Sequence, residues 1–125
     1  MAENKLVTSN IFTGCSKERI VEIYRAVGLK EYFVIMESEK FSCYSFGAEV
    51  KYFGLDFDET LTFANQLINI EVVAIIAVKI WEEDLHRVGD FTHVDSQIFK
   101  QGTVEIPLEN LDEFNEAIWG MVHKL

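Results

Sequence analysis

Two aspartates that stand one residue apart, Asp56 and Asp58, are the side chains in this sequence with the clearest chemical interest. They belong to the stretch Asp-Phe-Asp-Glu-Thr-Leu at positions 56–61. A carboxylate can act as a nucleophile in covalent catalysis. Such an attack requires near-contact geometry, so both carboxylates would have to be held at the rigid end of a strand. Whether they are held in this way depends on the elements around them.

This stretch resembles the first motif of the haloacid dehalogenase phosphotransferases. The resemblance implies that Asp56 would be the nucleophile, that Asp58 would be the general acid/base, and that both would help to hold Mg²⁺. Downstream, Gly-Asp-Phe-Thr-His-Val-Asp at positions 89–95 resembles the late acidic motif of the same family. Lys79 would then neutralise the phosphate. On this interpretation the protein is a small Mg²⁺-dependent phosphotransferase.

Three features of the sequence depart from that family. The family places its nucleophile on the first strand of a parallel doubly wound sheet, whereas about fifty residues precede Asp56 here. Only about thirty residues separate Asp58 from Asp90, which leaves too little chain for the βα units the family has there. Lys79 stands too close to the acidic segment to be a separate motif. We therefore interpret the match as accidental, expect no catalytic residue, and expect Asp58 to cap a helix. The phosphotransferase stays as the enzyme alternative.

A second group of candidate residues lies in the segment 82–95, where two histidines stand among five carboxylates. The group consists of Glu82, Glu83, Asp84, His86, Asp90, His93 and Asp95. Imidazole and carboxylate are common metal ligands, but histidines seven residues apart fit no standard metal motif. The two cysteines, Cys15 and Cys43, show no paired spacing either. We favour a solvated acidic loop and expect no metal and no cofactor.

The elements expected to position these residues follow from hydrophobic spacing and turn residues. Short strands are expected at 5–12 and 50–53, helices at 16–28 and 58–68, and a hairpin from 31–36 and 41–46. Residues 70–80 should form a central strand, 82–95 an irregular loop, and 96–100 and 103–107 a second hairpin. A final helix should follow Pro107 and carry an apolar stripe as far as Leu125, with Trp119 in the core.

These elements predict an α+β fold, a single-domain sandwich with a mostly antiparallel sheet and about three helices. Residues 1–125 are expected to form one globular domain. The N-terminus shows no secretory signal, and the longest apolar run, residues 72–78, is far shorter than the ~20 residues that cross a bilayer. We therefore expect a cytoplasmic protein.

Charge is the strongest global feature of the sequence. Twenty-one acidic and eleven basic side chains give a net charge of −10. Such a charge repels nucleic acid and anionic membranes and attracts basic partners. The sequence therefore predicts that the protein binds neither nucleic acid nor membrane.

A small acidic domain of this kind resembles bacterial toxin immunity proteins, including those of contact-dependent inhibition systems. The resemblance is one of size and charge. It implies a non-enzymatic protein that binds a cognate toxin domain, often a basic nuclease, as a heterodimer. A phage-type inhibitor that mimics nucleic acid is a related alternative. The residues expected to bind the partner are acidic and aromatic: Asp56, Asp58, Glu59, Trp81, Glu82, Glu83, Asp84, Asp90, Phe91 and Asp95.

Overall fold

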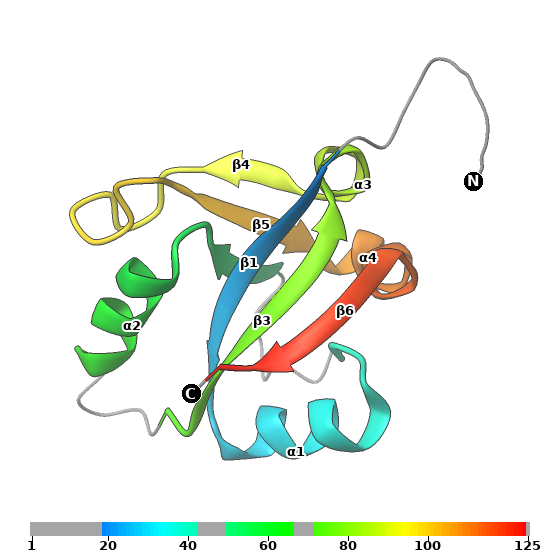
Figure 1. The fold of residues 1–125 in the computed structure, drawn as a ribbon, viewed down its shortest axis with the longest axis horizontal. Helices are drawn as coiled ribbons and strands as arrows, with labels where there is room; N and C mark the ends of the chain where they lie inside the picture. The colour runs from blue at the N-terminus through cyan, green and yellow to red at the C-terminus, as the bar shows by residue number, and fades with distance from the viewer. Residues whose placement is uncertain (1–18, 43–49, 67–71, 125) are drawn as a thin grey trace.

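The computed structural model describes residues 19–42, 50–66 and 72–124 (Figure 1). The elements in chain order are β1 (Ile20–Val27), α1 (Leu29–Ser38), β2 (Val50–Gly54), α2 (Phe57–Asn65), β3 (Ala74–Trp81), α3 (Glu82–Val88), β4 (Asp90–Thr92), β5 (Thr103–Pro107), the 3₁₀ turn η1 (Leu108–Asn110), α4 (Leu111–Ala117) and β6 (Ile118–His123).

The six strands form one sheet in the order β4-β5-β2-β1-β3-β6. Every pair of neighbouring strands in this sheet is antiparallel. The predicted α+β fold with an antiparallel sheet is confirmed, with four α-helices among the described residues where about three were expected.

The sheet consists of two three-stranded halves that meet at a single residue pair. In one half, β1 pairs with β3 over eight residues, and β3 pairs with β6. In the other half, β2 pairs with β5 over five residues, and β5 pairs with β4. Between the halves, β1 and β2 pair only at Tyr24 and Gly54. The strands therefore diverge on both sides of this pair, and each gap must be filled by side chains.

The core lies on one face of the sheet. Successive strand residues point to opposite faces, and Ile76, Val78 and Ile80 of β3 are fully buried on the core side. Helices α1, α3 and α4 contribute buried residues to the same cluster, among them Phe114. Phe114 packs against Phe53, with ring centroids 5.3 Å apart. Because aromatic pairs at this separation add to the burial energy, the aromatic cluster helps to hold α4 against β2.

Helix α2 lies against the opposite face, beside β1 (Figure 1). Phe57 of α2 packs edge-on against Tyr24 of β1, with ring centroids 5.7 Å apart. Phe63, further along the helix, contacts Phe99 in the turn region that follows β4. In the same view β3 and β6 are seen with no helix in front of them. This face is therefore covered unevenly, and its β1–β2 side is the better protected.

Three predicted elements are wrong in type. Residues 20–27 form β1 rather than part of a helix, because Val21, Ile23 and Val27 face the core with a period of two. Residues 29–38 form α1 rather than a hairpin arm. The segment 37–40, expected as the turn between the arms, contains the end of this helix. The final helix stops at Ala117, and Ile118–His123 is a strand in which Trp119 is 62% exposed rather than part of the core.

Smaller differences concern the segments around the candidate residues. Residues 82–92 form α3 and β4 rather than an irregular loop, whereas 96–100 form a turn rather than a strand. The predicted strands at 50–53, 70–80 and 103–107 are confirmed within a few residues by β2, β3 and β5. The strand expected at 5–12 lies outside the described residues, as does most of the one expected at 41–46.

Candidate partner-binding site

A cavity of about 210 Å³ fills one of the two gaps between the halves of the sheet. Its lining joins β1, the β2–α2 connection, α3 and β4: Arg19, Val21, Glu22, Ile23, Leu55, Glu82, Leu85 and Phe91. Five of these eight residues are apolar, and two of the other three are glutamates. We call this hollow the acidic cavity.

The two glutamates of the acidic cavity are held by neighbouring side chains. Glu82 accepts a hydrogen bond of 2.7 Å from Arg19, in an ion pair whose partners are 41% and 67% exposed. Glu22 accepts one of 2.7 Å from the hydroxyl of Tyr24. Burial, this hydrogen bond and the charges of Glu22 and Asp56 together raise the pKa of Tyr24 to about 12. The carboxylate of Asp56 therefore also acts on the β1 side of this site.

The β4 edge next to the acidic cavity combines an exposed aromatic ring with like charges. Phe91 is 45% exposed and stacks on His86, with ring centroids 4.6 Å apart. Asp90 stands directly opposite Glu105 on β5. Carboxylates that face each other across two strands repel. A hydrogen bond from Tyr52 to Glu105 offsets only part of this repulsion. That hydrogen bond, burial and the charge of Glu105 together raise the pKa of Tyr52.

The structure brings together several of the residues expected to bind a partner. Glu82 and Phe91 line the acidic cavity, and Asp56 follows directly on its lining residue Leu55. Glu83 on α3 and Asp90 on β4 are exposed beside it. Trp81 is half-buried at the end of β3, next to Glu82.

Other expected partner-binding residues have structural contacts or lie elsewhere. Asp84 is only 7% exposed and pairs with Arg87 at 3.1 Å. The carboxylate of Glu59 accepts a hydrogen bond of 3.1 Å from the backbone N–H of Gln101. Asp58 is exposed on α2, while Asp95, also exposed, lines the cavity on the other side of the Tyr24–Gly54 pair.

The predicted helix cap at Asp58 is wrong by two residues. Asp56 has the extended backbone of an N-cap, and its side chain accepts a hydrogen bond of 3.0 Å from the backbone N–H of Glu59. The carboxylate of Asp56 is therefore engaged at the start of α2, which is the use that short polar side chains have at this position. Asp58 is the second residue of the helix, in its first turn, where its charge faces the positive end of the helix dipole.

Sequence reasoning missed Glu22, Arg19 and Glu105 as members of this site. Glu22 was hidden by the helix expected at 16–28, in which it has no special position. With strand alternation it shares a face with Tyr24, and the signal was the β-branched pattern of residues 20–27. Glu105 could be found only from the strand register, because it meets Asp90 through the pairing of β4 with β5.

The second cavity, of about 330 Å³, lies in the other gap and contains an ion cluster. Arg25 on β1 binds Glu31 on α1 through two nitrogens, at 2.7 and 3.0 Å, and donates to the carbonyl oxygen of Tyr52 on β2. The buried Nζ of Lys51 lies 3.5 Å from the same glutamate. Burial alone would raise the pKa of Glu31, but the bonds to Arg25 and Lys51 outweigh it and lower this pKa. This cluster connects the two halves of the sheet.

Within the described residues, no group of three or more His, Cys, Asp and Glu side chains is arranged to hold a metal ion. In the same part of the chain, no helix is long and apolar enough to cross a membrane. Comparison with protein-family models, with curated proteins and with solved structures finds no match for this chain.

Proposed function

We propose that this protein is an immunity protein of the contact-dependent inhibition type, which binds a basic, nuclease-type toxin domain in the cytoplasm and neutralises it. The observation that supports this most is the composition of the acidic cavity. Two glutamates, Glu22 and Glu82, stand at a hollow whose other walls are five apolar side chains and Arg19, which pairs with Glu82. Lysine and arginine side chains have an apolar stem and a charged tip. A basic side chain of the toxin therefore matches this cavity in both parts.

The like-charged pair on the β4 edge supports the same proposal. Asp90 and Glu105 face each other in register, which destabilises the free protein. A cation of the toxin placed between them would remove that repulsion, so binding gains energy that folding alone does not. Phe91, exposed beside the pair, offers the kind of aromatic anchor that dominates many interfaces.

The net charge of −10 adds a kinetic advantage. Complementary charges can raise association rates to about 10⁸–10⁹ M⁻¹s⁻¹ at low salt. Fast capture suits a protein that must reach a toxin before the toxin reaches its target. No step of this function requires a catalytic residue, a metal or a cofactor.

The test uses the protein encoded immediately upstream, because an immunity gene directly follows its toxin gene. Isothermal titration should show a tight one-to-one complex, and co-expression should protect cells from that protein. Cytochrome c, an unrelated basic protein, should bind far more weakly, which separates specific recognition from general charge attraction. The absence of both binding and protection would overturn the proposal. So would Mg²⁺-dependent hydrolysis of p-nitrophenyl phosphate that is lost in Asp56→Asn.

A further inference from the structure

Strand β6 forms one edge of the sheet and has no charged residue. Its sequence, Ile-Trp-Gly-Met-Val-His at positions 118–123, contains no Asp, Glu, Lys, Arg or Pro. The opposite edge strand, β4, has only three residues and begins with Asp90. Edge strands offer unpaired backbone N–H and C=O groups, and short length and charge are the usual protections against pairing with another chain. Strand β4 has both protections, and β6 has neither.

Most of the exposed large apolar side chains lie on α1 and β6. The described residues include eight large apolar side chains that are exposed: Leu29, Phe33, Met36, Tyr52, Phe91, Val94, Trp119 and Val122. Five of the eight lie on α1 or β6. Their spacing of four and three residues places Leu29, Phe33 and Met36 along one stripe of α1. Tyr32 and His123, whose ring centroids are 5.3 Å apart, join this helix to the end of β6.

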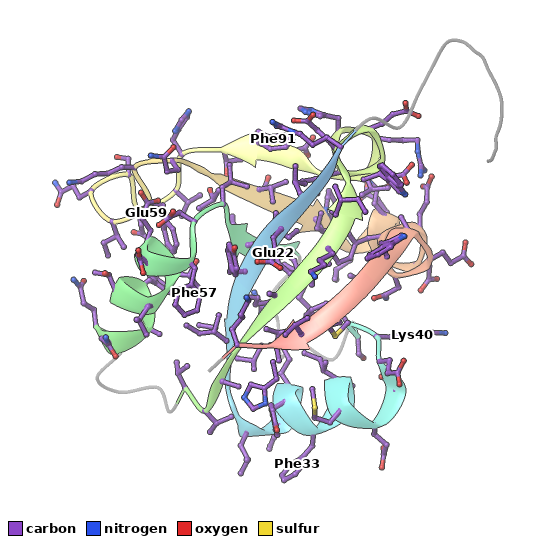
Figure 2. The ribbon with its side chains drawn as sticks, viewed as in Figure 1. Glu22, Phe33, Lys40, Phe57, Glu59 and Phe91 are labelled. Atoms are coloured by element: carbon purple, nitrogen blue, oxygen red, sulfur yellow. The ribbon has the colours of Figure 1, made fainter. Side chains whose placement is uncertain are left out.

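We call the strand β6 and the stripe Leu29, Phe33 and Met36 the β6–α1 surface. Phe33 points away from the body of the protein below α1 (Figure 2), and its side chain is 60% exposed. Trp119, the extra residue where the register between β3 and β6 shifts, is 62% exposed. Monomeric proteins seldom expose contiguous apolar patches unless these mark an interaction site.

We propose that the β6–α1 surface binds a second copy of this chain, with the two β6 strands paired antiparallel in a two-fold symmetric dimer. The charges around β6 favour this occupant. Glu116 is an exposed residue at the end of α4, separated from β6 by one residue. Lys124, directly after β6, is 42% exposed and lies 3.9 Å from Glu22 of the same copy, so it would have to reach Glu116 from this ion pair. Antiparallel pairing places the start of one strand beside the end of the other, so each Glu116 comes near Lys124 of the second copy. A symmetric dimer forms this contact twice.

The distribution of charge also disfavours a basic partner on this surface. Two copies with a net charge of −10 repel each other over most of their surfaces, and they approach at the lowest electrostatic cost along an uncharged strand. A basic toxin domain would gain nothing from such a strand, since β6 offers it no carboxylate. This proposal does not depend on the identity of the toxin or on its binding to the acidic cavity.

The test is sedimentation equilibrium of the full chain between about 1 and 200 μM, a range that spans common homodimer affinities. The wild-type protein should be a dimer at the upper end. Val122→Lys places a charge on β6 and should weaken the dimer at least 100-fold. Val94→Lys makes the same change at a valine of similar exposure, 37% against 39%, in the turn after β4. It should leave the dimer intact.

A charge exchange keeps the proposal testable if Val122→Lys disturbs folding. Glu116→Lys and Lys124→Glu should each weaken the dimer, and the double variant should restore it at least in part, because the two charges meet between copies. A wild-type chain that stays monomeric up to 200 μM would overturn the proposal and leave the edge to a different occupant. The proposal would also be overturned by a dimer that is unaffected by Val122→Lys, or that is unaffected by both Glu116→Lys and Lys124→Glu.

Discussion

The half of the sheet that ends at β4 and the half that ends at β6 have three strands each, yet they present opposite edges. Strand β4 is short, and its Asp90 faces Glu105. Strand β6 is twice as long and has no charged residue. Phe91 on β4 and Phe33 on α1 lie at opposite ends of the molecule in Figure 2. Both phenylalanine rings are exposed, but Phe91 lies near carboxylates, whereas Phe33 belongs to an apolar stripe of α1.

The difference shows how one small sheet can offer two separate binding surfaces. Charge on the β4 edge repels a second acidic copy and attracts a basic partner, because long-range potentials act before contact. The uncharged β6 edge leaves recognition to backbone hydrogen bonds and apolar burial. The two edge strands lie at opposite ends of the strand order, and an ion pair of 3.9 Å between Lys124, after β6, and Glu22 of the acidic cavity connects the two surfaces. A dimer in which each copy also binds a toxin domain is compatible with this arrangement.

This division depends on the join between the halves. The first test of this join disrupts the ion cluster of Glu31, Arg25 and Lys51. Glu31→Gln removes the charge that pairs with Arg25, 19% exposed, and with the buried Lys51. Removing this charge from its contacts with two buried or half-buried cations should cost about 3 kcal/mol of unfolding free energy. Urea denaturation at pH 7 measures this loss. Glu37→Gln, an exposed change on the same helix, should alter stability by less than about 0.5 kcal/mol.

The contribution of Glu31 should also depend on pH. Its pKa is lower in the folded protein than the ordinary value of 4.5. The carboxylate therefore stabilises the fold at pH values above 4.5, and this stabilisation is lost as the pH falls below 4.5. The gap in stability between wild type and Glu31→Gln should narrow over that range. A gap that stays constant down to acid unfolding would contradict the charged pairing.

Gly54 is the second part of the join, and Gly120 on β6 is its matched control. A Cβ atom at Gly54 would collide with the hydroxyl of Thr60 and would lie 2.8 Å from the ring of Phe99. At Gly120 the nearest atom, in the Lys79 side chain, is 3.9 Å away. Gly54→Ala should therefore cost about 2 kcal/mol through overpacking, while Gly120→Ala should be tolerated. Thermal unfolding of both variants compares the crowded centre of the sheet with its open edge.

The sequence predicted the fold class because the most buried segments have unambiguous patterns. Residues 74–81 are almost wholly apolar, and they form β3, an interior strand between β1 and β6. Residues 20–27 failed because their apolar positions fit a period of 3.6 as well as a period of two, and only pairing with β3 decides between them. Residues 118–123 failed for a related reason, since a stripe that continues from α4 fits a longer helix equally well.

The candidate site was predictable where it depends on composition and not where it depends on register. The acidic segments 56–59 and 82–95 are visible in the sequence. The acidic cavity is lined by Glu82, Leu85 and Phe91 of the second segment and by Leu55, just before the first. The neighbours of Glu22 and of Glu105 follow from strand pairing over a distance of many residues, which local patterns do not encode. Asp84 shows the opposite limit, because nothing in the sequence distinguishes this buried carboxylate from the exposed Glu83 next to it.

The smallest effects on stability are expected at Asp56 and Asp58, the two aspartates that resemble a phosphotransferase motif. Asp56→Ala removes the N-cap of α2 and should cost about 1 kcal/mol. Asp58→Ala removes only a favourable charge in the first turn, so it should cost a few tenths of a kcal/mol. Chemical denaturation of the two variants gives the comparison. Equal losses of stability would show that the bond from Asp56 to the N–H of Glu59 does not contribute as a cap.

In the proposed complex, the β4 edge rather than the net charge as a whole captures the basic partner. Stopped-flow association with the protein encoded immediately upstream tests this proposal. Glu83→Lys with Asp90→Lys changes exposed residues beside the acidic cavity. Glu37→Lys with Glu39→Lys changes exposed residues at the end of α1. Each pair adds four charges, so both proteins go from −10 to −6.

We expect the first pair to slow association about 10- to 100-fold at low salt, and the second pair only a few-fold. The difference should shrink near physiological ionic strength, where the screening length falls to about 8 Å. Equal slowing by the two pairs, or an association rate that does not respond to salt, would contradict the account, because the acidic edge would then have no special role in capture.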